Sequence, residues 1–344
     1  METFTIRDIA RICKVSTSTV SRAINNDPGI NQKTKERVLR VVKEFHFVPN
    51  NSARNLKRVD SNTVALISKG IGNSFFQSMY PLFEIELLKH GFQFILSEIG
   101  NDRDSGRAAA EIAKERRLKG IIFLGGMMEQ PEILINQVDV PYVLCTVAVN
   151  ADHERYGCSS VAIDDEKESF RIVDYLCKRG HKRIAIISGY KDDNAVGMLR
   201  IKGYEEALKD NGIEVCDDLI GYMPTNIPDY TIESGYAVMK ELLSRNNGIT
   251  AVFATSDLTA FGAYRAIAEA GLKIPDDISV VGFDGIDMTR YMVPSLTTVR
   301  QPRENMVKAS VDLLMKEIEG ESDTSQLVYD AEIIERESVR TAGD

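Results

Sequence analysis

Two short helical patterns near the amino terminus, with almost no chain between them, restrict the fold of this protein more than any other feature. Thr5 and Asp8 have the spacing of a capping box, and apolar residues follow at helical period as far as Cys13. A second helix is expected to begin at Ser16, whose hydroxyl can accept from the amides of the first turn. Only residues 14–15 separate the two patterns, so the helices must meet at a steep angle, as in a helix-turn-helix.

The second helical pattern has one apolar and one polar face. Its apolar positions, which predict a buried stripe, are Val20, Ala23 and Ile24. The opposite face carries side chains of the kind that reach base edges and phosphates in the major groove, namely Thr17, Ser18, Ser21, Arg22 and Asn25. On these residues alone, an ordinary solvated helix face explains the pattern equally well.

The surrounding chain favours nucleic-acid binding. A third helix is expected over residues 31–45, after a break at Asp27-Pro28-Gly29, so three short helices make one small all-α domain. Residues 1–60 hold 12 lysines and arginines against 6 acidic residues, which leaves 30 against 45 for the rest of the chain. A basic head on an acidic body would attract a polyanion to one end only.

The head also resembles the amino-terminal signature of the lactose-repressor (LacI/GalR) family of transcription regulators. The matching stretches, in the order and spacing of that family, are Thr5-Ile6-Arg7-Asp8-Ile9-Ala10, Val15-Ser16, Thr19-Val20-Ser21-Arg22, Asn25-Asn26, Thr34-Lys35-Glu36-Arg37-Val38 and Val48-Pro49-Asn50. Lys14 and His46 depart from the pattern, because they stand where the family has residues that tolerate positive φ. The resemblance implies DNA contacts by Thr5, Ser16, Thr17, Ser18, Thr19, Ser21, Arg22, Asn25, Asn50, Ala53 and Leu56.

Residues 50–61 are open to two interpretations. Their composition suits a flexible linker, but it also suits a short helix with Ala53 and Leu56 on one face. An isolated helix of fewer than ~12 residues is marginal in water, so this one would form only with support. The resemblance implies a hinge helix that orders on the operator, with Leu56 as an apolar wedge in the minor groove. The expected domains are therefore a head at 1–49, a hinge at 50–61 and a body at 62–344.

The body alternates short apolar runs with helical patterns, which predicts an α/β body of two doubly wound parallel-sheet subdomains. Strands or extended pieces are expected at residues 63–68, 92–96, 120–124, 141–144, 161–164, 183–187, 250–254, 278–283, 297–301 and 327–334. Helices are expected at residues 75–90, 107–117, 167–178, 196–211, 230–244, 258–270 and 302–318.

The resemblance extends through this body, where it implies the periplasmic-binding-protein fold. Its landmarks are Gly120-Ile121-Ile122, Gly180-His181-Lys182-Arg183-Ile184-Ala185, Arg200-x-x-Gly203-Tyr204, Ser279-Val280-Val281-Gly282-Phe283-Asp284 and Leu296-Thr297-Thr298-Val299. The chain is expected to return late to both halves. We assign residues 62–162 and 297–325 to the first subdomain, and residues 163–293 and 326–344 to the second.

Ligands of open α/β sheets bind beyond the carboxyl ends of the strands, so residues just after strands are candidates for an effector site. Arg200 and Asp284 are the leading pair, expected to face each other across an interdomain cleft and to hold the hydroxyls of a polar ligand. An exposed arginine and a helix-capping aspartate are the alternative readings. As an aromatic pair, Phe75 and Phe76 are more typical of a core position than of a ligand platform. The resemblance places these four residues at effector contacts, together with Thr146, Tyr230, Ser256, Asp257 and Gln301.

The sequence favours no enzyme, metal or cofactor site. Gly70-x-Gly72 lacks the third glycine of a dinucleotide fingerprint, since Phe75 stands in its place. The five cysteines are widely spaced and the four histidines are scattered, which fits reduced thiols better than disulfides or zinc ligands. No apolar run resembles a signal peptide or reaches the ~18 residues of a membrane span, so we expect a cytoplasmic protein that does not bind membranes.

These observations predict a sequence-specific DNA-binding regulator, a repressor controlled by a small molecule, with double-stranded DNA as its partner. A homodimer on a pseudo-palindromic operator is expected, since one helix-turn-helix reads too few base pairs. The effector is expected to be a sugar or a derivative, but Thr146, Ser256 and Gly285 differ from some sugar-responsive relatives, so its identity stays open. Control by a protein co-repressor is the main alternative. An enzyme or a transport-type sugar-binding protein on the same fold is a weaker one.

Overall fold

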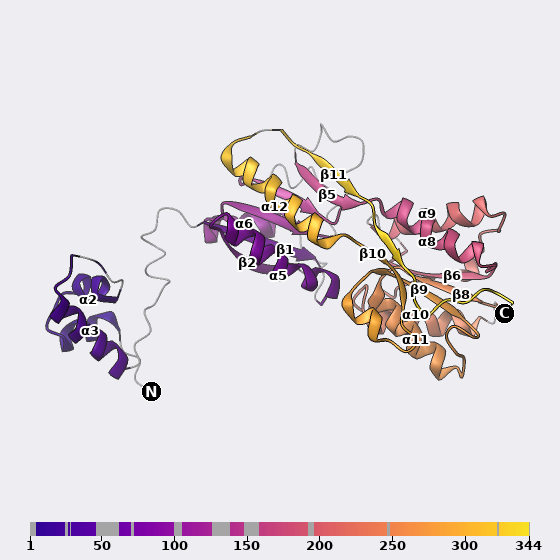
Figure 1. Cartoon of the computed structure of the whole chain (residues 1–344), viewed down its shortest axis with the longest axis horizontal. Helices are drawn as coiled ribbons and strands as arrows, with labels where there is room; N and C mark the ends of the chain where they lie inside the picture. The colour runs from indigo at the N-terminus through magenta and orange to yellow at the C-terminus, as the bar shows by residue number, and fades with distance from the viewer. Residues whose placement is uncertain are drawn as a thin grey trace. The chain divides into compact units, whose positions relative to one another are not determined.

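The computed structural model of the chain describes residues 5–24, 27, 29–45, 62–69, 72–99, 105–125, 138–147, 158–191, 196–245, 248–321 and 323–343 (Figure 1). The chain divides into two compact units, Met1–Ser61 and Asn62–Asp344. The first unit is all-α in its described part, and the second is α/β.

The amino-terminal unit contains α1 (Ile6–Ile12), α2 (Thr17–Ile24) and α3 (Gln32–Glu44). The capping box at α1 is confirmed: the amide of Thr5 donates to Asp8 Oδ2 over 3.0 Å, and the amide of Asp8 donates to Thr5 Oγ1 over 3.4 Å. Lys14, in the turn, has a φ of 50°, the positive value expected there. The three helices close over a small core formed by Ile9, Ala10, Cys13, Val20, Ala23 and Val38.

In its described residues, the body contains two six-stranded sheets. In the first the strand order is β11-β5-β4-β3-β1-β2, and in the second it is β12-β10-β9-β8-β6-β7. Every pairing is parallel except that between β10 and β12. The strands of the first sheet are β1 (Thr63–Lys69), β2 (Gln93–Ile99), β3 (Gly120–Leu124), β4 (Tyr142–Cys145), β5 (Ser159–Ile163) and β11 (Gln326–Tyr329). Those of the second are β6 (Ile184–Ser188), β7 (Ile220–Tyr222), β8 (Ala251–Ala254), β9 (Ser279–Asp284), β10 (Thr297–Arg300) and β12 (Glu332–Ile334).

Helices cover both sheets. The long ones are α5 (Ser74–Lys89), α6 (Ser105–Arg116), α8 (Asp165–Lys178), α9 (Val196–Asp210), α10 (Ile232–Ser244), α11 (Asp257–Glu269) and α12 (Arg303–Glu319). Figure 1 shows α8 and α9 on one side of the second sheet, and α10 and α11 on the other. Each pair packs at backbone contact: a Cβ added at Gly203 of α9 would lie 2.1 Å from the carbonyl oxygen of Glu166, and one added at Gly262 of α11 would lie 2.1 Å from that of Ile232.

The expected alternation of strands and helices is confirmed, but the assignment of two late strands to subdomains was wrong. Strand β10 pairs with β9 in the second sheet, and β11 pairs with β5 in the first. The chain therefore crosses between halves after Arg300 and again after Tyr329. Local apolar patterns predict that a segment is a strand, but its neighbour in the sheet is set by long-range packing. The short edge strand β7 was also not anticipated.

No helix in the described part of the chain is long and apolar enough to cross a membrane.

Candidate DNA-binding face and effector site

The polar face of α2 is built by its cap and its buried stripe. The Ser16 hydroxyl accepts from the amide of Thr19 over 3.1 Å, as expected of an N-cap. Val20 and Ala23 are buried against the other two helices, which turns the opposite face outward. The exposed candidate DNA contacts are Thr5, Ser16, Thr17, Ser18 and Arg22, while Thr19 and Ser21 are half-buried. Within the amino-terminal unit, most of this face is thus exposed, as contact with a groove of DNA requires.

Four candidate DNA contacts, Asn25, Asn50, Ala53 and Leu56, lie outside the described residues, as does His46. The hinge at residues 50–61 therefore remains a prediction. In the described turn, Arg22 lies 3.9 Å from Asp27, a distance that leaves its guanidinium available for a phosphate.

Arg200, on α9, is buried at the carboxyl edge of the second sheet. Its Nε donates to Asp165 Oδ1 over 2.8 Å, and its Nη1 donates to the carbonyl oxygen of Thr255. The guanidinium carbon lies 3.9 Å from the centre of the Phe283 ring. Burial alone would lower the pKa of Arg200, but the carboxylates of Asp165 and Asp284 outweigh it and raise this pKa. The cation is therefore held firmly in place.

Asp284 ends β9 beside this arginine. Its carboxylate accepts from Gln301 Nε2 over 3.0 Å, and its carbonyl accepts from the Gln301 amide over 3.2 Å. Burial raises the pKa of the Asp284 carboxyl to about 7, although the charge of Arg200 works against this shift. Arg200, Asp284 and Gln301 thus form one polar cluster, which the sequence predicted as effector contacts.

Three of the candidate effector residues have a backbone conformation that side chains with a Cβ rarely adopt. The φ angles of Thr146, Tyr230 and Asp284 are 73°, 52° and 118°. Such strain costs ~1–3 kcal/mol per residue and is typical of binding sites. The buried Thr146 Oγ1 also has no hydrogen-bond partner among the described residues. A polar ligand would satisfy it.

Ser256 and Asp257 already have structural partners. The Ser256 hydroxyl caps α11 by accepting from the amide of Thr259 over 3.3 Å. The Asp257 carboxylate accepts from Thr298 Oγ1 over 2.6 Å and from the amide of Ile286 over 2.8 Å. Burial raises its pKa well above the ordinary value, and the nearby Asp284 raises it further. The side chains of Ser256 and Asp257 therefore stabilise the backbone next to the Arg200 cluster.

Phe75 and Phe76 occupy the first turn of α5, where Asn73 Oδ1 accepts from the Phe75 amide over 2.9 Å. Both rings are buried in the core of the body, with centroids 6.0 Å apart. They belong, with Thr146, to the half built on the first sheet. In the described part of the chain, no hydrogen bond or ion pair joins the side chains of these three residues to the Arg200 cluster.

Comparisons with known proteins agree with this architecture. Residues 5–50 match the family described as bacterial regulatory proteins, lacI family, and residues 173–339 match the periplasmic binding protein-like domain. The regulator MalR of Clostridium butyricum is 37% identical over 97% of this chain and 98% of its own length. The repressor CytR of Escherichia coli K12 is 32% identical over 98% of this chain and 96% of its own. The solved complex of the regulator CelR with cellobiose has a TM-score of 0.72 and 31% identity, covering 97% of this chain and 99% of that one.

The chain belongs to the LacI family. Like these relatives, it is a DNA-binding transcription regulator. A regulator from Enterococcus faecium, solved with bound ribose, has the same fold at a TM-score of 0.69 and 27% identity, over 81% of this chain and 99% of that one.

For this LacI-family chain, one expectation about geometry was wrong. Arg200 and Asp284 do not face each other from opposite halves, because both are carried by the second sheet and its helices. Parallel strands end at the same edge, so residues after β6 and after β9 come together on one side. A ligand at this edge of the second sheet would therefore contact Arg200 and Asp284 on the same side.

Asp165, which holds Arg200, was missed. It follows β5 in the run Asp164-Asp165-Glu166, where each carboxylate is an ordinary candidate for the first turn of a helix. The exposed fraction of the Asp165 side chain is only 2%, and burial raises its pKa while Arg200 opposes the shift. Three successive acidic residues gave no signal as to which one points inward.

Among the described residues, no group of three or more His, Cys, Asp and Glu side chains is placed to hold a metal ion. All five cysteines are free thiols.

Proposed function

We propose that this LacI-family regulator is a dimeric repressor whose operator affinity is controlled by a sugar or a sugar derivative bound at the Arg200 cluster. One observation carries the proposal. The buried Arg200 guanidinium, which donates to Asp165, occurs together with polar residues that have a positive φ and lie just after strands. Such groups are arranged before a ligand arrives, so binding costs little reorganisation. Charged side chains there would hold the ligand's hydroxyls through charge-assisted hydrogen bonds.

Two relatives support a sugar as the ligand class. One solved regulator holds cellobiose and another holds ribose. The hydrogen-bond pattern of this chain differs at Thr146, Ser256 and Gly285, so we leave the particular sugar open.

The proposed mechanism couples two sites through the hinge. A ligand that contacts the Arg200 cluster in one half and Thr146 in the other favours one arrangement of the halves. That arrangement would favour or disfavour an ordered hinge at residues 50–61, which lies between the head (1–49) and the body (62–344). Two α2 helices would then enter successive major grooves of a pseudo-palindromic operator.

Exposed apolar side chains support the dimer. Large apolar residues are exposed on α5, on the edge strand β2 and around the short helix η3 (Asp287–Tyr291), namely Ile85, Leu88, Leu96, Met288, Tyr291 and Val293. Apolar surface of this kind marks interaction sites, and a second copy of the chain is the partner that a palindromic operator requires.

A thermal-shift panel of sugars, sugar phosphates and nucleobases tests the effector. We expect a hit to raise the melting temperature of the body and to change operator affinity, and we expect Asp284→Asn to abolish both effects. Lys202→Gln, on the exposed face of α9, is the matched control and should keep both. If no compound stabilises the protein, control by a protein co-repressor becomes the better hypothesis.

Selection of bound DNA from a random pool tests the operator. We expect a pseudo-palindrome with a flexible central step, because a wedge at the centre requires base unstacking. Selected sites without two-fold symmetry would contradict the dimeric binding mode.

A further inference from the structure

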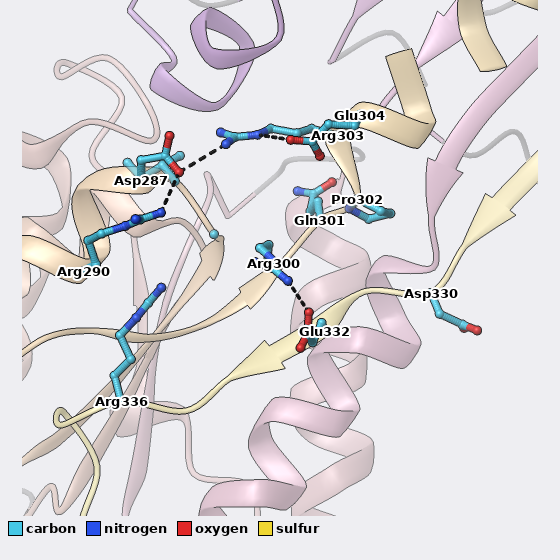
Figure 2. Close-up of a pocket in the computed structure, with 12 residues that line it drawn as sticks. Asp287, Arg290, Arg300, Gln301, Pro302, Arg303, Glu304, Asp330, Glu332 and Arg336 are labelled. Atoms are coloured by element: carbon cyan, nitrogen blue, oxygen red, sulfur yellow. Dashed lines mark hydrogen bonds and ion pairs between the residues drawn. The ribbon is translucent and has the colours of Figure 1, made fainter. Parts of the chain in front are cut away.

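A pocket of about 480 Å³ lies in the body where the chain crosses between halves. Its walls come from three stretches, which are residues 285–290, residues 300–304 and residues 330–336 (Figure 2). The second and third stretches contain the two late crossings of the chain. Four arginines line this crossover pocket, namely Arg290, Arg300, Arg303 and Arg336.

Three of these arginines have acidic partners. Arg290 and Arg303 share the carboxylate of Asp287 at 3.4 Å and 3.2 Å, and Arg303 also lies 3.4 Å from Glu304. Arg300 pairs with Glu332 on the neighbouring strand β12 (Figure 2). The side chains of Arg290 and Arg300 are more than half exposed, so these pairs are weak and can be exchanged for another anion.

The lining holds four arginines and four acidic residues, and the fourth arginine, Arg336, pairs with none of these carboxylates. Arg336 Nη1 donates to Thr289 Oγ1 over 3.1 Å and to the carbonyl oxygen of Leu296, and no carboxylate of the described residues lies within ion-pair distance of it. The remaining acidic residue of the lining, Asp330, pairs with Lys167 at 2.7 Å.

The surroundings of Arg336 are unfavourable for its charge. Burial lowers the pKa of Arg336, and the positive charges of Arg290 and Arg300 lower it further, whereas Asp257 acts in the opposite direction. Burial in turn raises the pKa of Asp257, which favours its neutral form. A guanidinium stays protonated in proteins, so an anion that approached would gain from all three arginines.

We propose that the crossover pocket binds the anionic group of a small ligand, a phosphate or a carboxylate, between Arg290, Arg300 and Arg336. Guanidinium forks match the oxygens of both anions, and charge-assisted hydrogen bonds are stronger than neutral ones. The first turn of α12, which begins at Arg303 in the same wall, adds the positive end of a helix dipole.

The position of the pocket gives this anion a regulatory role. Gln301, which donates to Asp284 in the proposed effector site, also lines the crossover pocket. An anion bound there contacts both crossing segments and so favours one arrangement of the halves. The anion site does not depend on the sugar site, because it can be occupied and measured when no uncharged sugar binds.

Titration calorimetry of the full-length protein tests the proposal, with inorganic phosphate, a hexose phosphate, a hexuronate and the uncharged hexose as separate ligands. We expect saturable binding of at least one of the three anions, with an affinity that falls as salt is added. Binding of both phosphates but not the uronate identifies a phosphate site, and the reverse identifies a carboxylate site. Binding of none of the three anions overturns the proposal. If the anions bind but the uncharged hexose does not, the result counts against the proposed effector site and leaves the anion site supported.

Variants locate the site. Arg290→Gln combined with Arg300→Gln should weaken anion binding about tenfold or more, because two charged hydrogen-bond donors are removed. Asp287→Asn should tighten it, since Arg290 and Arg303 lose a competing carboxylate. Arg265→Gln, whose arginine pairs with Glu269 on α11 outside the pocket, is the control and should leave the affinity unchanged. Equal affinities in all four proteins, or weaker binding by Asp287→Asn, would contradict the assignment.

Discussion

At the scale of single residues, Arg200 shows how strongly a buried ion pair depends on both partners. The side chains of Arg200 and Asp165 are only 7% and 2% exposed, and their atoms lie 2.8 Å apart. Arg200→Met should lower the free energy of unfolding by about 3–5 kcal/mol, because Asp165 would stay buried without a counter-ion. Urea unfolding of the body measures this loss.

The control for Arg200→Met lies on the same helix. Lys202 pairs with Glu166 at 2.8 Å but is largely exposed, so Lys202→Met should change the free energy of unfolding by no more than about 1 kcal/mol. Adding Asp165→Leu to Arg200→Met should recover part of the stability, since the buried carboxylate of Asp165 is then removed as well. A small loss for Arg200→Met, similar to that for Lys202→Met, would contradict the argument.

Asp284 should make the stability of the body depend on pH. Burial raises its folded pKa to about 7, above the unfolded value of 3.8, so the folded state holds the proton more tightly. The stabilisation is fully present below the unfolded pKa and is lost as the pH rises through about 7. Between about pH 5 and about pH 8, the wild type should therefore lose more stability than Asp284→Asn. Parallel stability curves for the two proteins would refute this assignment.

At the scale of the elements, the turn between α1 and α2 contains a residue with a strained backbone conformation, and a substitution can relieve this strain. Lys14 has a φ of 50°, a conformation that costs a residue with a Cβ roughly 1–2 kcal/mol. Lys14→Gly should stabilise the head by about 0.5–1 kcal/mol, because glycine adopts this φ freely but gains entropy in the unfolded chain. Hydrogen exchange of the buried Ile9 and Val20 amides in the full chain measures the change.

A glycine introduced nearby, inside α1, should change the stability of the head in the opposite direction. Arg11 lies within α1 and is exposed, so Arg11→Gly should destabilise the head by about 1 kcal/mol. If both glycines weakened the protection of Ile9 and Val20, the strain assigned to Lys14 would be absent.

At the scale of the whole molecule, the two edges of the first sheet differ in their expected partners. Leu96 on β2 and Val328 on β11 are both exposed apolar residues on edge strands, at 44% and 60%. Leu96→Asp should shift a dimer toward monomers in sedimentation equilibrium, because a charge would be buried in the proposed interface. Val328→Asp should leave the mass unchanged. Dissociation by Val328→Asp alone would place the interface on the opposite edge.

In the proposed mechanism, DNA binding depends on the hinge as well as on the head. Leu56→Ala should weaken operator binding much more than non-specific binding, because the proposed wedge acts only on bent operator DNA. Arg58→Ala should mainly reduce the dependence of binding on salt, as expected for a phosphate contact. Equal losses on operator and random DNA for Leu56→Ala would remove the case for a wedge.

Much of this architecture was predictable because it is encoded locally. The capping box at Thr5, the cap at Ser16 and the positive φ of Lys14 follow from interactions between residues a few positions apart. Apart from β7, the strands of the body were predicted from their apolar runs. Asp284 was chosen because it ends a strand, whereas Gln301 was chosen from the family resemblance. Parallel strands end at one edge, so such residues meet without further information.

The sequence by itself therefore determined the helix-turn-helix, the α/β alternation and the polar residues at the strand ends. Only the tertiary structure decided that β10 and β11 exchange halves, that Asp165 holds Arg200, and that Arg336 lies near Arg290 and Arg300 in one pocket. The physical reason is the range of the interactions. Caps and apolar stripes join near neighbours in the chain, whereas strand order, buried ion pairs and pocket walls join segments that meet only when the chain is packed.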